Sequence, residues 1–225
     1  MLGGSEGRRA ELVALVRVGA LGVTPEHGFG KASRFLAKPV GKGGVGAVIF
    51  GLFGRKRARM APVNALLERI VGASREPALY LQGGIPDNFE GRFEALTLHL
   101  FLVLRRLREL PAPAADAAQD LIDASFAYLE LGFRQGGISD VAVPKRMKKI
   151  GRSFYGRLLG YEEALAAEDS GALAAALSRN IAPGVDAVAL ARHIRAAAAV
   201  LATRSLDDIL ASDPLFPSFA DSIPA

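Results

Sequence analysis

The stretch of sequence that decides the fold is VPKRMKKIGRSFYGRLLGYEEAL, residues 143–165. Its apolar residues recur at intervals of three and four, and they are Val143, Met147, Ile150, Phe154, Leu158, Tyr161 and Leu165. At about 3.6 residues per turn, this spacing places all of them on one side of an α-helix. The stretch therefore predicts one long amphipathic helix that continues to about residue 167.

The same spacing recurs along the chain from residue 61 onward. It predicts further helices at residues 62–73, 89–107, 114–133, 169–180 and 185–203. In the third of these, the line of residues expected to be buried is Ala117, Leu121, Ala124, Tyr128 and Leu131. No comparable run alternates with the period of two that a strand requires. The expected fold class is therefore all-α, with about six to seven helices in a single helical domain.

Three segments follow from this pattern. Residues 1–51 are rich in glycine and in basic residues, and we expect them to form a flexible N-terminal extension. Residues 52–205 carry the helical domain. Residues 206–225 contain Pro214, Pro217 and Pro224, and we expect an irregular C-terminal tail there.

The formal net charge of +5 is distributed unevenly along the chain. Residues 1–60 hold eleven Lys and Arg against three Glu, whereas residues 61–225 hold seventeen Lys and Arg against twenty Asp and Glu. The basic character therefore belongs to the N-terminal quarter. A basic arm on a nearly neutral body suits anionic lipid, ribosomal RNA or an acidic protein surface as a partner.

The apolar segments near the N-terminus are too short to cross a membrane. The longest apolar run there covers residues 45–53 and contains two glycines, whereas a spanning helix needs about 20 apolar residues. We therefore expect the protein in the cytoplasm, with peripheral contact at the inner face of the cytoplasmic membrane. In a eukaryote, the corresponding place is the mitochondrial matrix and inner membrane.

Two glycine-containing motifs match catalytic or nucleotide-binding patterns only in part. Gly41 to Gly46 fits a dinucleotide fingerprint, but Pro39 interrupts the strand that must precede such a loop. Residues 151–156 resemble a hydrolase nucleophile elbow, but Tyr155 stands where the second glycine is required. We expect neither a nucleotide site nor a hydrolase site.

The histidines do not form a metal site. His27, His99 and His193 are far apart in sequence, none has a ligand-type partner one helical turn away, and the chain has no cysteine. His99 flanks an apolar stripe, so we expect its side chain to pack between helices. As the acid–base group of an unrecognised enzyme it would need a polar pocket with a carboxylate. The expected protein is not an enzyme and uses no cofactor or metal.

Two basic clusters are candidates for binding. In the first, Phe53 precedes the basic residues Arg55, Lys56 and Arg57, and an apolar residue beside cations suits contact with a membrane or another anionic surface. An ordinary solvated arm is the alternative.

The second basic cluster lies on the helix at 143–167. Lys145, Lys148, Lys149 and Arg152 fall on the face opposite the apolar stripe, and no acidic residue occurs from 141 to 160. Cations crowded on one face repel each other, so this face favours an anionic partner, with plain solvated surface as the alternative. Arg157 falls instead on the apolar side, where it needs a carboxylate or carbonyl partner.

The residues around this cluster resemble a known family. Phe154-Tyr-Gly-Arg157, followed by Tyr161-Glu-Glu-Ala-Leu165, is similar to a motif of the ubiquinol–cytochrome c chaperone family, the complex III assembly factors of mitochondria and alphaproteobacteria. Four further segments fit in the same order, and they are residues 85–93, 98–107, 143–148 and 169–180. The resemblance covers roughly residues 52–181.

This resemblance implies a helical chaperone without cofactor, small-molecule substrate or catalytic activity. In mitochondria, such proteins bind newly made cytochrome b near the ribosomal exit tunnel, together with a small partner protein. The implied partners are therefore nascent cytochrome b or another complex III subunit, and a ribosome with a small partner protein. The basic clusters add peripheral contact with an anionic membrane. The residues expected to bind partners are Lys145, Lys148, Lys149, Arg152, Phe154, Tyr155, Arg157 and Tyr161. The alternative is an RNA- or ribosome-binding module that acts through the basic helix at 145–157.

Overall fold

The computed structural model describes residues 60–167, 169, 171–211 and 213–223. The chain divides into two units, Met1–Lys56 and Arg57–Ala225, and the described residues all belong to the second. The extension expected at residues 1–51 and the expected membrane-contact residues Phe53, Arg55, Lys56 and Arg57 lie outside the described residues.

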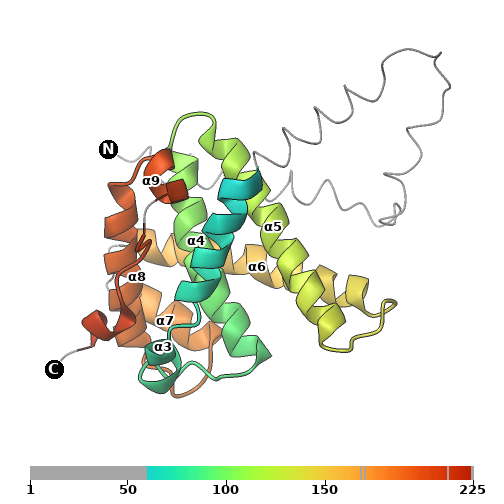
Figure 1. Cartoon of the computed structure of the whole chain (residues 1–225). Helices are drawn as coiled ribbons and strands as arrows, with labels where there is room; N and C mark the ends of the chain where they lie inside the picture. The colour runs from blue at the N-terminus through green and yellow to red at the C-terminus, as the bar shows by residue number, and fades with distance from the viewer. Residues whose placement is uncertain (1–59, 168, 170, 212, 224–225) are drawn as a thin grey trace, which may run out of the picture. The chain divides into compact units, whose positions relative to one another are not determined.

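Within the described residues the fold is all-α, as the sequence predicts (Figure 1). A helix at residues 60–73 comes first. It is followed by α3 (Pro77–Leu81), α4 (Phe89–Glu109), α5 (Ala114–Gln135), α6 (Val143–Ala166), α7 (Gly171–Asn180), α8 (Ala187–Ala202), α9 (Leu206–Ala211) and the 3₁₀ helix η1 (Phe219–Ser222). The helices predicted by apolar periodicity are present, and the ends of α4, α5, α6, α7 and α8 agree with the prediction to within about two residues.

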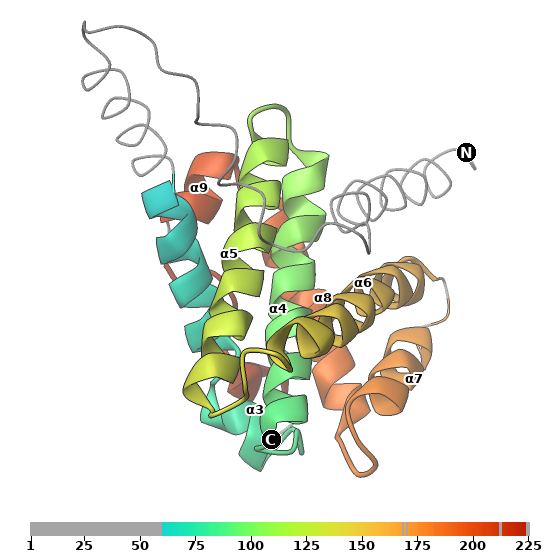
Figure 2. The same cartoon turned by 90° about the vertical axis from the view of Figure 1, so that its right-hand side faces the viewer.

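Helix α4 is the centre of the fold. Its residues from Phe93 to Leu104 are all buried, because α5, α6 and α8 pack around it. Helices α4 and α5 run antiparallel side by side, and α6 crosses them (Figures 1 and 2). The Asn88 side chain accepts a hydrogen bond from the Gly91 amide at 2.9 Å and so caps the start of α4. The chain leaves α4 at Leu110, just before Pro111.

The buried face of α5 differs from the predicted one. The buried residues are Ala114, Ala118, Asp120, Leu121, Ile122, Ser125, Leu129 and Phe133, whereas Leu131 is 53% exposed. This helix is rich in alanine, so two adjacent lines of residues both satisfy the helical spacing. Packing selects the line that contains Ile122, Leu129 and Phe133, because these larger side chains bury more apolar area.

The C-terminal segment is ordered and packed, in contrast to the irregular tail that the sequence predicts. Residues 206–223 contain α9 and η1, and Leu215, Phe216 and Phe219 are buried. Both carboxylate oxygens of Glu76 accept the Phe219 amide at 3.0 Å, which ties the segment to the beginning of the domain. Pro214 and Pro217 lie between α9 and η1, and the aromatic side chains beside them fill the core.

No helix within the described residues is both long enough and apolar enough to cross a membrane.

Candidate docking surface on α6

Helix α6 buries most of its predicted apolar stripe, and Met147 and Leu165 are half-buried. Val143, Ile150, Phe154, Leu158 and Tyr161 are all buried, and the stripe packs against α4, α5 and α7. Pro144 occupies the first turn, where its missing amide hydrogen costs nothing.

Two residues that the sequence proposes for partner binding belong to the core. The side chain of Phe154 is 1% exposed and that of Tyr161 is 0% exposed. Their position in the apolar stripe explains this burial, so neither can touch a partner in this conformation. Tyr155 is half-buried and stacks on Phe126, with ring centroids 6.3 Å apart.

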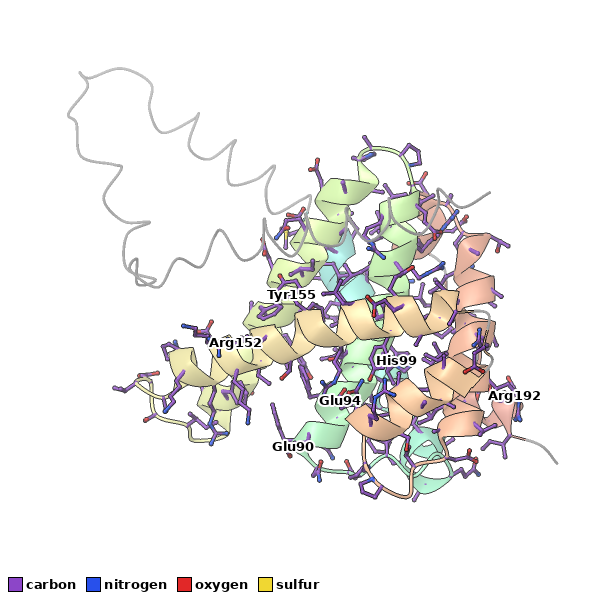
Figure 3. The ribbon with its side chains drawn as sticks, turned by 180° about the vertical axis from the view of Figure 1, so that it is seen from behind. Glu90, Glu94, His99, Arg152, Tyr155 and Arg192 are labelled. Carbon is purple, nitrogen blue, oxygen red and sulfur yellow. The ribbon has the colours of Figure 1, made fainter. Side chains whose placement is uncertain are left out.

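Lys145, Lys148, Lys149 and Arg152 form an exposed row on the outer side of α6, which we call the cationic row. Within the described part of the chain, none of these four side chains forms an ion pair. Figure 3 shows Arg152 and Tyr155 on the crossing helix α6. The row is therefore an open positive surface, as the helical spacing predicts.

The start of α6 is charged opposite to what helix stability favours. The amino end of a helix carries a partial positive charge, so acidic residues stabilise the first turn and basic residues destabilise it. The first turn of α6 has no acidic residue, its N-cap Ala142 makes no side-chain bond, and Lys145 and Arg146 follow at once. The helix dipole and the cationic row therefore add to the same positive potential.

Arg157 finds the carboxylate that its position on the apolar side requires. Its Nε donates to both oxygens of Glu94, at 3.1 and 3.0 Å, and its Nη2 donates to Oε1 at 2.8 Å. These hydrogen bonds raise the pKa of Arg157. Burial, followed by the charge of Glu94, raises the pKa of Tyr161, whose hydroxyl lies 3.5 Å from that carboxylate. Arg157 thus pairs with Glu94 inside the domain and does not belong to the cationic row.

A second ion pair between α4 and α6 has no signal in the sequence. Glu162 is buried, and its carboxylate lies 3.0 Å from Arg108 and 3.4 Å from Arg105. Together with the Arg157–Glu94 pair, it fixes the rotation of α6 on α4. Helical spacing places Glu162 beside the stripe, but only the tertiary contact identifies its arginine partners.

His99 and His193 form a buried pair between α4 and α8. Their ring centroids are 6.0 Å apart, and Phe216 and Phe219 contact them with ring edges. His99 Nδ1 lies 2.7 Å from the Ala95 carbonyl oxygen. Burial lowers the pKa of His99 to about 4 and lowers that of His193 as well. These contacts make His99 a packing residue, and no cluster of three metal-binding side chains occurs within the described residues.

The described residues thus define a class of protein, an all-helical domain with a row of four exposed cations on α6. The model of the family described as Ubiquinol-cytochrome C chaperone matches residues 81–216, and the chain belongs to this family. The match begins at residue 81, after the start of the resemblance at residues 52–181, and it continues past residue 181 to include α8 and α9.

Two proteins illustrate the similarity. The crystal structure of the Cbp3 homolog from Brucella abortus superposes with a TM-score of 0.66 at 38% sequence identity, covering 76% of this chain and 98% of that one. The mouse (Mus musculus) ubiquinol-cytochrome c reductase complex assembly factor 1 is 28% identical over 100 residues, which are 44% of this chain. The alignment spans 34% of the mouse protein.

Proposed function

We propose that this protein is a non-enzymatic assembly chaperone for ubiquinol–cytochrome c reductase and that it binds newly made cytochrome b. Family membership is the observation that carries the proposal. The mouse relative is named as an assembly factor of the same complex, which supports the proposed role for this chain.

The described part of the chain offers features that suit such a role. The ion pair between Arg157 and Glu94 joins α6 to α4, so these charged side chains serve the packing of the helices. The cationic row of α6 is an exposed charged surface of the described residues. We propose that this row is the docking surface, because four exposed cations without acidic partners favour an anionic contact.

An affinity pull-down tests the choice of client. The tagged full-length chain is captured from detergent-solubilised membranes of cells that make it, and cytochrome b is followed by immunoblot and by its haem spectrum. We expect cytochrome b to co-purify, and to do so most strongly while its synthesis is under way. Deletion of the gene should lower the amount of haem-loaded cytochrome b; a normal amount contradicts the proposal.

The cationic row also supports a second candidate function, binding of RNA or of a ribosome. A basic helix that contacts several phosphates binds RNA with an affinity that falls steeply as salt increases. Replacement of Lys145, Lys148 and Lys149 by Glu should then abolish binding to ribosomal RNA. Binding that is absent, or that does not respond to salt, removes this candidate.

A further inference from the structure

The region where α5 ends and α6 begins combines the cationic row with exposed apolar side chains. The exposed fractions are 91% for Val141 and 53% for Leu131. Val141 lies in the turn that leads into α6, and Leu131 lies in the last part of α5. We call these two residues the apolar tip. Single exposed apolar side chains are common on protein surfaces. Here two of them lie where α5 ends and α6 begins, in the region that also carries the cationic row, and this combination suits a partner that accepts both cations and apolar side chains.

The acidic residues near this region are already neutralised. Arg134 pairs with Glu130 at 2.8 Å and with Asp140 at 2.5 Å. Residues 130–152 contain six Lys and Arg against these two acids, a net charge of +4. Within residues 130–152 the charge of the cationic row is therefore not balanced, and the amino end of α6 adds its partial positive charge.

We propose that the cationic row and the apolar tip together bind the surface of an anionic phospholipid bilayer. Phosphate headgroups form the outer layer of such a surface and hydrocarbon lies directly beneath it, so the surface rewards cations and exposed apolar side chains at the same time. An RNA backbone rewards the cations alone. The nearly complete exposure of Val141 therefore favours lipid over RNA.

Anionic lipid is thus the proposed partner of the cationic row. Only the link between lipid binding and complex assembly rests on the proposed function. Lipid binding itself needs no client. A chaperone held in this way would stand at the membrane surface where a membrane protein inserts.

Vesicle co-sedimentation with the full-length protein tests the inference. The probes are vesicles of phosphatidylcholine alone and vesicles of phosphatidylcholine mixed with phosphatidylglycerol, at physiological ionic strength. We expect binding to the mixed vesicles only. The N-terminal quarter is also basic, so the informative quantity is the change between variants of the same full-length chain.

Charge variants measure the contribution of the cationic row. Each cation near an anionic surface contributes about 1 kcal/mol, so Lys149→Gln should lower the partition coefficient about fivefold. The matched control is Arg179→Gln, which removes an exposed cation from α7 and should leave binding unchanged. Equal effects of the two variants would show a dependence on net charge alone and overturn the inference.

A polar variant of the apolar tip separates lipid from RNA. Val141→Ser should lower vesicle binding severalfold without any change in charge, because a valine side chain transferred to hydrocarbon contributes about 1–2 kcal/mol. The control Val188→Ser changes another exposed valine, which is 63% exposed at the start of α8, and should have no effect. Unchanged vesicle binding of the Val141 variant, or RNA binding stronger than vesicle binding, overturns the inference.

The same variants distinguish a failure of this inference from a failure of the proposed function. If Lys149→Gln loses cytochrome b in detergent but keeps its vesicle binding, the row contacts the client and the lipid proposal is wrong. If vesicle binding falls as expected but the wild-type chain captures no cytochrome b, lipid binding stands and the client proposal is wrong.

Discussion

Replacing Arg157 by Met should destabilise the domain considerably, because it strands a buried carboxylate. The side chain of Glu94 is 6% exposed and that of Arg157 is 27% exposed. Removing one partner of a fully buried ion pair costs about 3–5 kcal/mol. Because water can reach this pair from the arginine side, we expect the free energy of unfolding to fall by about 2–3 kcal/mol.

A double-mutant cycle isolates this interaction. Glu94→Leu alone should cost about 1–2 kcal/mol, since the freed Arg157 can turn toward water, and the double variant should cost about 1 kcal/mol because two apolar side chains then pack together. The expected coupling energy is about 2 kcal/mol or more. Urea unfolding followed by far-ultraviolet circular dichroism gives these values.

The control for this cycle is the exposed pair of Arg134 with Glu130. Arg134 is 48% exposed, so Arg134→Met should cost less than about 1 kcal/mol. Additive effects of the Arg157 and Glu94 variants, with no coupling, would refute the claim that this pair holds α6 on α4.

Four further predictions concern stability. Since burial lowers the pKa of His99 to about 4, the folded state keeps the ring neutral while the unfolded state binds a proton below about pH 6.5. The free energy of unfolding should thus fall by about 3 kcal/mol between about pH 6.5 and pH 4, and His99→Leu should flatten the profile. A Cβ at Gly91 would lie 1.9 Å from the Pro86 carbonyl oxygen, so Gly91→Ala should cost more than about 2 kcal/mol in urea unfolding. A Cβ at Gly156 meets nothing within 4 Å, so Gly156→Ala should raise stability by about 0.5–1 kcal/mol, and a loss at this site would contradict the described packing of α6. Phe154→Ala should lower the melting temperature by roughly 10 °C, because it empties about one ring volume in the core; a shift below about 2 °C would contradict its burial.

The sequence predicts those elements whose apolar spacing leaves one choice. Helix α6 has large apolar side chains along its stripe, so both its extent and its buried face follow from the pattern. The extent of α4 also follows, but its burial on all sides from Phe93 to Leu104 does not follow from one stripe. The buried face of α5 does not follow from the pattern, because alanine fits a buried or an exposed position almost equally well. The ordered C-terminal segment is missed because Phe216 and Phe219 are buried by distant contacts and not by a local period.

The candidate docking surface on α6 is also only partly predictable from the sequence. The cationic row depends only on helix geometry, so the sequence predicts it. The need of Arg157 for a carboxylate follows from its position on α6, but Glu94 is 63 residues away and only the fold identifies it. Phe154 and Tyr161 belong to a family-like motif, and the sequence alone could not separate a binding role from a packing role. Their burial assigns them to packing.

The most direct test of the account is complementation by a chain whose cationic row is reversed. Cells that lack the gene receive the full-length chain with Lys145→Glu, Lys148→Glu and Arg152→Glu, and the spectrum of haem-loaded cytochrome b in their membranes is measured. These side chains are exposed, so the variant should fold and accumulate normally. We predict a loss of haem-loaded cytochrome b beside a normal level with Arg179→Glu. A normal level with the reversed row would contradict the claim that α6 is the docking surface.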